Sequence, residues 1–504
     1  MNILKRNIIA NYFGQFYSIL IGIIMVPFYL KYLGTEAYGL VGFFVLVQSW
    51  MALFDLGLSP TLSREVAKVR TSDTQNSRFE FILLLHSLEF VFIIFSFIMM
   101  IVIVLFSEFI AIKWLNVVTL DLDTVSYCIK LMGIMVGLNF MTALFQSGIK
   151  GAEAQVWLNL TNIILRTLQF VGVLLVLYFI DNDIKLFFEY QLIIIFITLI
   201  VFSFKFYKLM NIGRFKIYFA YKNIKPIVPF AMAIAYTGGL SIIATQLDKL
   251  LLSNVLVLKE FGFFTLVALV ANAIMQFSGP IGQAIQPRMT SLLHQGKTEE
   301  MMKLYRQFTQ YTAIIIFSIV GIVGFFSYEL LYAWTGNKEA SLWGKDILFW
   351  YAMGNGILAV AAFTYYLQFA YGKMKMLVQY NTIQAIIQLP FVVWAAYTYG
   401  AIGVAITWFI FRLISMLIWT PLVHHKFAPG IHKDWIFKDI LPIFLGSILY
   451  LYCIDSIGLK FDGTRVEIFS ILIGLGIGML IVNMIISSEG RKLILKILGN
   501  KSVK

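Results

Sequence analysis

Long apolar runs recur about fourteen times between residues 8 and 488, and short polar connections separate them. A helix needs about 20 mostly apolar residues to cross the hydrocarbon core of a bilayer, and each run is close to that length. Helices are the expected spanning form because every backbone hydrogen bond must be satisfied within the membrane. The alternating segments of about ten residues that mark a β-barrel are absent from the sequence. The pattern therefore predicts an all-α polytopic membrane protein, with spans at 8–30, 37–58, 81–106, 125–148, 155–180, 186–204, 226–252, 261–287, 310–333, 346–371, 377–398, 401–423, 437–455 and 466–488.

Composition and charge support this class and add an orientation. Hydrophobic residues make up 60% of the chain and charged residues only 13%. With the N-terminus inside, the connections predicted to lie inside hold 27 Lys and Arg residues, and those predicted outside hold 8. Because this bias sets the orientation of membrane proteins, we expect both termini in the cytoplasm. The same bias accounts for the formal net charge of +13, so no nucleic-acid partner is expected.

The chain shows traces of an internal duplication. Gly39 matches Gly262 at an offset of 223 residues, and Gln146 matches Gln368 at an offset of 222. An offset equal to six spans means that both copies enter from the same side, as in transporters built from parallel repeats. We therefore expect two six-helix lobes followed by two further helices. The predicted division is 1–204 (N-terminal lobe), 205–225 (basic cytoplasmic linker), 226–423 (C-terminal lobe), 437–488 (last two spans) and 489–504 (basic cytoplasmic tail).

Two arginines lie far inside predicted spans. Arg166 is about 11 residues into its span, roughly 16 Å along a helix, and Arg412 is about midway along another. A cation at such depth costs several kcal/mol unless it faces protein or water, so both should point into the bundle. Each could pair with polar groups and only hold helices together, or it could line a cationic cavity for an anionic substrate. Lys249 is a third candidate for that lining, and its neighbour Asp248 is a candidate for titration or for holding a coupling cation.

Glu89 and His86 form a further polar feature, because residues three apart share one face of a helix. Such a pair could relay protons, or it could be a satisfied polar patch near the interface. Signatures of phosphate-loop ATPases, zinc proteases and serine hydrolases are absent from the sequence. The longest predicted outer loop, 107–124, is short for the catalytic site of a membrane polymerase. We therefore expect a protein that is not an enzyme and that uses no metal or cofactor.

Four stretches resemble polysaccharide exporters of the oligosaccharide-lipid flippase kind. They are residues 32–39 (YLGTEAYG) and 55–64 (DLGLSPTLSR) in the first half, and 246–252 (QLDKLLL) and 261–262 (FG) in the second. With the span count and the two-lobed layout, the resemblance covers essentially the whole chain. The chain is similar to the O-antigen flippase group (Wzx-type) of the multidrug/oligosaccharidyl-lipid/polysaccharide exporter superfamily.

This resemblance implies a V-shaped pair of lobes in the bacterial inner membrane that works by alternating access and is driven by an ion gradient. The implied substrate is an oligosaccharide repeat unit linked to undecaprenyl diphosphate, which moves from the cytoplasmic to the periplasmic leaflet. Arg166, Arg412 and Lys249 would then attract the diphosphate, since a guanidinium fork suits phosphate oxygens. Besides membrane lipids, candidate partners are a polysaccharide polymerase and a chain-length regulator. Candidates for a cytoplasmic gate are Asp55, Arg64 and Arg288.

Other functions stay open on the sequence alone. A multidrug exporter of the same superfamily would have the same span pattern, although a cavity holding Arg and Lys is a poor host for cationic drugs. A membrane O-antigen polymerase is the alternative from the enzyme class, and a scaffold for a polysaccharide assembly complex is a third. Asp248, Glu89 and His86 are the candidates for ion coupling or gating in a transporter.

Overall fold

The computed structural model describes residues 3–71, 75–213 and 218–499. Within these ranges the regular structure is helical, apart from one isolated bridge between Asn116 and Val257. Thirteen helical segments in the described part are long and apolar enough to cross a membrane, which confirms the predicted all-α polytopic class. Residues 214–217 of the predicted linker and 500–504 of the predicted tail lie outside the described residues.

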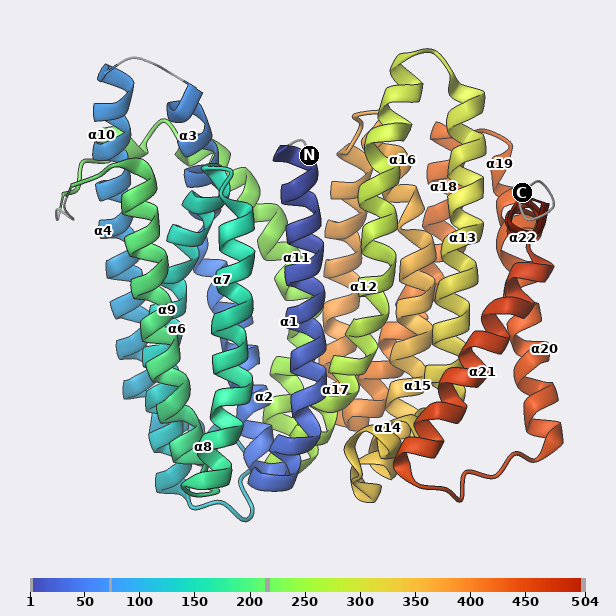
Figure 1. Ribbon diagram of the computed structural model, residues 1–504, viewed down its shortest axis with the longest axis horizontal. Coiled ribbons are helices and arrows are strands. Elements are labelled where there is room, and N and C mark those ends of the chain that lie inside the picture. Colours follow the sequence, from blue (N-terminus) through green and yellow to red (C-terminus); the bar gives the residue numbers. More distant parts are fainter. Residues whose placement is uncertain (1–2, 72–74, 214–217, 500–504) are drawn as a thin grey trace. The chain divides into compact units, whose positions relative to one another are not determined.

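The helices form two compact units, Met1–Gly262 and Phe263–Lys504. The central helix of the first unit is α6, which packs against α3, α4 and α9 (Figure 1). The elements of this unit are α1 (Ile3–Leu33), α2 (Thr35–Met51), η1 (Ala52–Asp55), α3 (Leu58–Thr71), α4 (Gln75–Leu105), α5 (Ser107–Phe109), η2 (Ile110–Trp114), α6 (Leu122–Gly151), α7 (Gln155–Thr167), η3 (Leu168–Gly172), α8 (Val173–Phe179), α9 (Ile184–Met210), α10 (Tyr221–Ile224) and α11 (Val228–Val255).

The second unit is built around α13 and α15. Helix α15 packs against α13 and α17, and α13 also packs against α20 and α21. The elements are α12 (Leu258–His294), α13 (Thr298–Phe325), α14 (Ser327–Thr335), α15 (Lys338–Ala361), α16 (Phe363–Ala370), α17 (Lys375–Ile414), η4 (Ser415–Trp419), α18 (Thr420–Phe427), α19 (Ile431–Asp434), η5 (Trp435–Ile440), α20 (Leu441–Ile457), α21 (Arg465–Ile486) and α22 (Ser488–Gly499). The first turn of α12 belongs to the first unit.

Two predicted spans, 377–398 and 401–423, lie within one continuous helical run of the second unit. Gly400 interrupts that run with φ 62° and ψ −145°, a backbone conformation that favours glycine. The rings of Tyr380 and Trp419 then stack at 4.6 Å, and residues 391 and 411 bring their Phe rings to 5.8 Å. Such pairing requires two antiparallel helices that turn at Gly400. The thirteen segments and the fourteen predicted spans therefore describe the same course of the chain.

Contacts in the first unit bring together helix ends that were predicted to lie inside. The Asn7 side chain donates to the Glu153 carbonyl at 3.3 Å, which joins the start of α1 to the turn before α7. The Arg78 guanidinium at the start of α4 donates to the Met210 carbonyl at the end of α9, at 3.2 Å. These contacts agree with the predicted alternation of the spans, in which all four ends fall on one side.

A buried carboxylate organises the opposite end of the first unit. Glu36, in the first turn of α2, is only 6% exposed. Its two oxygens accept backbone N–H donors from Val118 at 2.6 Å, Thr119 at 2.8 Å and Leu120 at 3.2 Å. The same loop also contacts the start of α12, because the Asn116 carbonyl accepts the Leu258 N–H at 2.8 Å. Glu36 thus holds the loop on which the start of α12 rests.

Replacing Glu36 with alanine should lower the free energy of unfolding by about 2 kcal/mol, because three backbone N–H groups and the Thr119 hydroxyl lose a charged acceptor. The matched change Glu36→Gln keeps one side-chain oxygen as an acceptor. Its free energy of unfolding should lie between those of the alanine variant and the native protein. Thermal unfolding of the three purified proteins in one detergent measures both effects. Equal stability of all three would show that the loop does not depend on this carboxylate.

Gly39 and Gly262, which the sequence pairs at an offset of 223 residues, both make close contacts within the first unit. A Cβ on Gly39 would lie 2.3 Å from the Leu258 carbonyl oxygen, and a Cβ on Gly262 would lie 2.5 Å from the Thr35 carbonyl oxygen. Thr35 and Leu258 are also 223 residues apart in the sequence.

Helix α11 packs with the first unit, although the predicted division groups it with the second lobe. It contacts α2, η1 and α3, and a Cβ on Gly57 would lie 2.4 Å from the Ala231 carbonyl oxygen. The Arg64 guanidinium also lies 4.4 Å from the centre of the Phe230 ring. These close approaches are tertiary contacts that a hydropathy pattern does not contain. The functional division into lobes stays a prediction.

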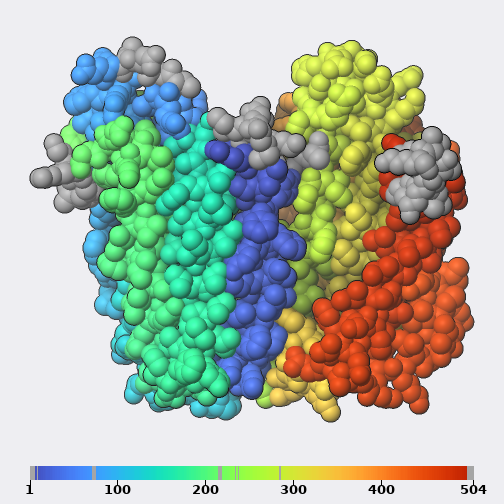
Figure 2. Space-filling view, viewed as in Figure 1, coloured from blue at the N-terminus to red at the C-terminus, as the bar shows by residue number. Residues whose placement is uncertain are grey.

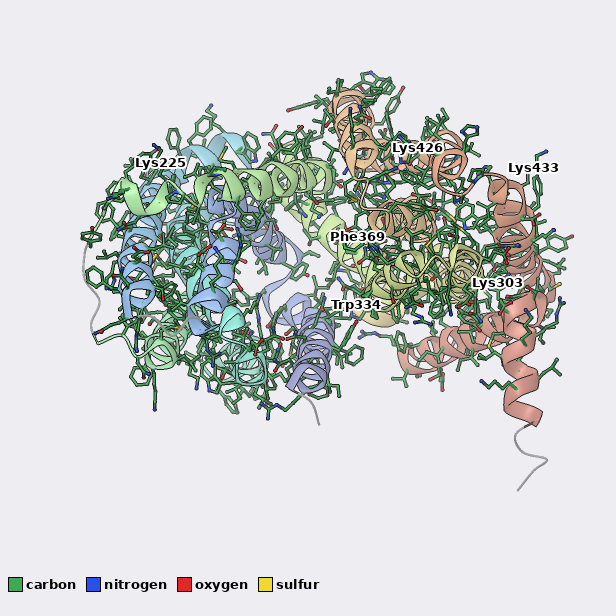
Figure 3. All side chains as sticks on the ribbon, turned by 90° about the horizontal axis from the view of Figure 1, so that it is seen from above. Lys225, Lys303, Trp334, Phe369, Lys426 and Lys433 are labelled. Atoms are coloured by element: carbon green, nitrogen blue, oxygen red, sulfur yellow. The ribbon has the colours of Figure 1, made fainter. Side chains whose placement is uncertain are left out.

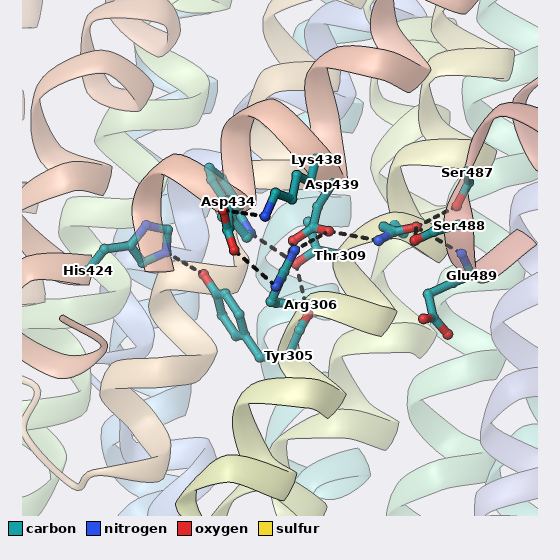
Figure 4. A network of polar contacts seen from close by, with 12 residues as sticks. Tyr305, Arg306, Thr309, His424, Asp434, Lys438, Asp439, Ser487, Ser488 and Glu489 are labelled. Carbon is teal, nitrogen blue, oxygen red and sulfur yellow. Dashed lines mark hydrogen bonds and ion pairs between the residues drawn. The ribbon is translucent and has the colours of Figure 1, made fainter. Parts of the chain in front are cut away.

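A polar network fastens the last helices of the second unit to α13 (Figure 4). Arg306 donates from Nε and Nη2 to the two oxygens of Asp439, at 2.6 and 3.0 Å. Gln310 donates to the same carboxylate at 2.7 Å, and Tyr305 shares a hydrogen bond of 2.7 Å with Nε2 of His424. Asp439 has no exposed surface, so a dense set of donors replaces its water.

The same network reaches the junction of α21 and α22 through Gln310. Its side-chain oxygen accepts from the Ser487 hydroxyl at 2.6 Å, the Ser488 hydroxyl at 3.1 Å and the Glu489 N–H at 3.1 Å. The network therefore joins the start of α13 to α18, to the segment just before α20 and to the end of α21. Three lysines of predicted inside segments lie on these elements (Figure 3): Lys303 on α13, Lys426 on α18 and Lys433 on α19.

Large apolar side chains cover the outward faces of both units. In the first unit, α1, α7, α8 and α9 form much of the surface seen in Figure 2. In the second unit, α20 and α21 carry similar side chains. Exposed examples are Phe13 (62%), Phe16 (63%), Ile164 (61%), Phe179 (74%), Phe204 (69%), Leu449 (62%) and Val466 (76%). A surface of this kind is stable when lipid covers it.

Candidate functional site

A polar pocket of about 410 Å³ lies within the first unit, and we call it the amide pocket. Its walls come from α2, η1, α3, α6, α7, η3 and α9, all of them in or beside predicted spans. The lining residues are Gln48, Met51, Ala52, Asp55, Ser59, Val136, Asn139, Phe140, Thr142, Ala143, Gln146, Asn162, Leu165, Arg166, Gln169, Ile195 and Thr198. Five carboxamides, three hydroxyls, one carboxylate and one guanidinium therefore surround one cavity.

Helical spacing gathers these polar side chains. On α6, Asn139 and Gln146 are seven residues apart, and on the α7–η3 segment Asn162 and Gln169 have the same spacing. Seven residues are close to two turns, so each pair shares one face. Arg166 lies between Asn162 and Gln169 and donates to the Gln169 side-chain oxygen at 2.9 Å. The Arg166 side chain therefore lines the polar pocket.

A π-helical turn, η3, shapes the wall next to Arg166. Widening the helix frees carbonyl groups, and side chains from other helices satisfy them. The Tyr190 hydroxyl donates to the Leu168 carbonyl at 2.9 Å, and the Gln191 amide donates to the Gln169 carbonyl at 3.1 Å. From α1, the Tyr29 hydroxyl donates to the Phe170 carbonyl at 2.8 Å. These three bonds fix the turn that positions Gln169 in the pocket.

Asp55 enters the pocket from a break in the second span. The α-helix ends at Met51, a 3₁₀ turn follows, and Leu56 and Gly57 have positive φ values of 47° and 71°. The Asp55 carboxylate then accepts the Ser59 backbone N–H at 3.1 Å, which caps the start of α3. The stretch DLGLSPTLSR therefore encodes the end of the second span, a turn at Leu56 and Gly57, and the start of α3, with the acidic side chain of Asp55 at the turn.

Four carboxamides of the pocket have no hydrogen-bond partner among the residues that the structure describes. Among the described residues, no hydrogen bond joins the side chain of Gln48, Asn139, Gln146 or Asn162 to another protein group of the pocket wall. A polar group within the membrane costs free energy unless water or a ligand meets it. The pocket therefore offers eight amide donors and four carbonyl oxygens to whatever fills it.

Lys249 and Asp248 lie together on α11 in the first unit, outside the amide pocket. The Lys249 ammonium donates to the Thr245 carbonyl at 3.2 Å and to the Gln246 side-chain oxygen at 2.9 Å, both on its own helix. The Asp248 carboxylate accepts the Lys249 backbone N–H at 2.8 Å. The structure thus brings Asp55 and Arg166 into one site and gives Lys249 local acceptors.

Arg412 lies in the second unit, where its guanidinium stacks 4.0 Å from the centre of the Trp408 ring. Its buried Nε has no hydrogen-bond partner among the described residues. Trp408 in turn donates to Asn355 at 3.1 Å, and Asn355 donates to the Ala271 carbonyl at 2.7 Å. The arginine is therefore held beside a chain of bonds that links α17, α15 and α12.

The pair that helical spacing predicted on α4 is formed. His86 Nδ1 and Glu89 Oε2 lie 2.9 Å apart, and both residues are buried. The Tyr207 hydroxyl on α9 donates to the other oxygen of Glu89 at 2.6 Å. Of the two remaining gate candidates, Arg64 stacks on Phe230, whereas Arg288 is exposed on α12.

Comparison with known proteins adds a family to this geometry. Residues 4–293 match the model of the family described as polysaccharide biosynthesis protein. A putative O-antigen transporter from Shigella flexneri is 22% identical over 422 residues, which are 83% of this chain and 97% of the relative.

Solved structures share the fold. A lipid II flippase, MurJ, in an inward closed conformation superposes with a TM-score of 0.71 at 16% identity, over 97% of this chain and 99% of its own. An inward-facing multidrug resistance MATE family transporter of the MOP superfamily gives 0.67 at 13% identity, over 82% and 96%. The family model covers more than half of the chain. The protein, with its thirteen candidate membrane spans in the described part, therefore belongs to the polysaccharide biosynthesis protein family.

Proposed function

We propose that this protein is a flippase for oligosaccharide repeat units linked to undecaprenyl diphosphate. It moves them from the cytoplasmic to the periplasmic leaflet of the bacterial inner membrane, for O-antigen or a related surface polysaccharide. Both termini lie in the cytoplasm. The observation that carries this proposal is the amide pocket, because a polar cavity with an arginine lies inside a set of membrane-spanning helices.

The chemistry of the substrate explains why such a pocket is needed. The polar head combines a diphosphate with a glycan, and hydrocarbon offers neither of them a hydrogen bond, so unaided passage is prohibitively slow. A cavity lined by side-chain donors and acceptors replaces the lost water. The isoprenoid chain stays in lipid beside the protein. Alternating access then exposes the cavity first to one side of the membrane and then to the other.

The cationic side chains Arg166, Arg412 and Lys249 supply attraction for the polar head along its path. Spread over separate helices, they bind weakly enough to allow release. The acidic residues Asp248 and Glu89, with His86, couple transport to an ion gradient. The hydrogen bond between His86 and Glu89 supports that role, because proton uptake by either partner changes the bond.

A multidrug exporter is the second candidate function, and the likeness to a MATE transporter favours it. The composition of the amide pocket argues for the glycan. A cationic drug would meet the Arg166 guanidinium inside the pocket, and the pocket has little of the aromatic surface that binds such drugs.

The test is a leaflet-resolved assay of the lipid-linked oligosaccharide in a deletion strain, with and without the gene on a plasmid. Loss of periplasm-facing glycan with build-up of the cytoplasmic precursor is the expected result. An unchanged leaflet distribution with altered polymer length would instead identify a polymerase. Unchanged glycan with increased drug sensitivity would identify a drug exporter.

A further inference from the structure

We infer that the amide pocket is a subsite for neutral sugar rings of the glycan and not for the diphosphate. This inference rests on the proposed function and specifies which part of the substrate the first unit binds. It changes the role of Arg166, which then donates to sugar oxygens and does not neutralise a phosphate.

The balance of donors and acceptors is the first argument. A carboxamide carries two N–H donors and a carbonyl oxygen, and a sugar hydroxyl donates once and accepts twice. The two groups therefore satisfy each other on both sides. A diphosphate only accepts, so the carbonyl oxygens of Gln48, Asn139, Gln146 and Asn162 would be left facing anionic oxygens.

The charge of the pocket is the second argument. Arg166 and Asp55 are its charged residues, so its formal net charge is zero. The Asp55 carboxylate accepts one backbone N–H from Ser59 with Oδ1, and within the described ranges Oδ2 accepts no hydrogen bond. That oxygen repels a phosphate within a space of about 410 Å³ but accepts a sugar hydroxyl readily.

Preorganisation is the third argument. The Gln169 side-chain oxygen accepts from the Arg166 guanidinium at 2.9 Å. The turn that carries Gln169 is held because Tyr190, Gln191 and Tyr29 donate to carbonyl groups of η3. A guanidinium bonded to Gln169 and unpaired amides on three helices, α2, α6 and α7, give the fixed pattern of hydrogen bonds that distinguishes one hydroxyl configuration from another. The volume suits roughly one or two sugar rings, by comparison with ordinary small-molecule sites.

The experiment measures binding of the free glycan to the purified full-length protein. The probe is the reducing oligosaccharide released by mild acid from the lipid-linked repeat unit of the native strain, and inorganic pyrophosphate is the competitor. Variants Asn162→Leu and Asn139→Leu each remove one amide from the pocket. Gln384→Leu makes the matched change on α17 in the second unit, at a residue that does not line the pocket.

We expect the native protein and Gln384→Leu to bind the oligosaccharide equally, and each pocket variant to bind about tenfold more weakly. Pyrophosphate should not displace the oligosaccharide. Native-like binding by both folded pocket variants would overturn the inference, as would displacement by pyrophosphate or the absence of binding up to about 10 mM oligosaccharide. Leucine is more apolar than asparagine, so these changes do not hinder insertion, and thermal unfolding confirms folding.

The leaflet assay separates failure of this inference from failure of the proposed function. If deletion traps the precursor in the cytoplasmic leaflet while Asn162→Leu binds oligosaccharide normally, the protein is a flippase and the sugar subsite lies elsewhere. If deletion leaves the leaflets unchanged, the proposed function itself is wrong.

Discussion

Replacing Asp439 with alanine is expected to lower the free energy of unfolding by about 3 kcal/mol, because it leaves a partly buried cation and a buried amide without their acceptor. Asp439 has no exposed surface and accepts two bonds from Arg306 and one from Gln310. Gln310 also holds the junction of α21 and α22 through Ser487, so the loss should loosen the last two spans. Thermal and denaturant unfolding of the purified protein measure the effect.

Asp434 offers the matched control on the same arginine. Its carboxylate lies 3.5 Å from Arg306 and 2.9 Å from Lys438, but its side chain is 42% exposed. Solvent-exposed pairs contribute little, so Asp434→Ala should unfold almost as the native protein does. In the double variant Arg306→Met with Asp439→Leu, no buried charge is left unpaired, and it should be more stable than Asp439→Ala alone. Equal effects of Asp439→Ala and Asp434→Ala would contradict this account of the network.

The second large effect is expected on transport. Arg166→Leu should reduce surface polysaccharide and the rate of translocation by one to two orders of magnitude. This corresponds to the roughly 1.5–3 kcal/mol that a hydrogen bond to a charged group contributes. Arg166→Lys keeps a donor but loses the planar fork, so it should retain part of the activity.

Leucine at position 166 also makes the span more apolar, so poor insertion is not the expected cause of the loss. Lys130→Leu is the control, since it removes a cation from α6 that lies 4.0 Å from Glu108 and is 43% exposed. That variant should transport at close to the native rate. Full transport by Arg166→Leu at native protein levels would remove the arginine from the mechanism.

Much of the fold could be predicted because every helix that crosses the lipid bilayer needs a run of about 20 apolar residues. Runs of about 20 apolar residues located the helices, and Gly400 fell in the predicted gap between 398 and 401. The packing of α11 on the first unit could not be predicted, because it depends on close contacts such as that of Gly57 with Ala231.

The candidate site could be predicted only in part. Depth in a span singled out Arg166, because an intramembrane cation is costly. The amides around it were not predicted, because a neutral polar side chain in an apolar span costs less free energy than a charge and is therefore a weaker signal of function. Their signal was present as Asn139 with Gln146 and Asn162 with Gln169, each pair seven residues apart. Arg306 was assigned to a connection because the predicted span began at 310, whereas α13 begins at Thr298.

The most direct test of the central claim is translocation by the purified protein in liposomes. The substrate is the native undecaprenyl-diphosphate-linked oligosaccharide, placed in one leaflet and followed by its access to an external glycan-modifying enzyme. The account predicts that liposomes with the native protein expose the glycan on the opposite side much faster than empty liposomes or those with Arg166→Leu. Equal rates in all three preparations would contradict it.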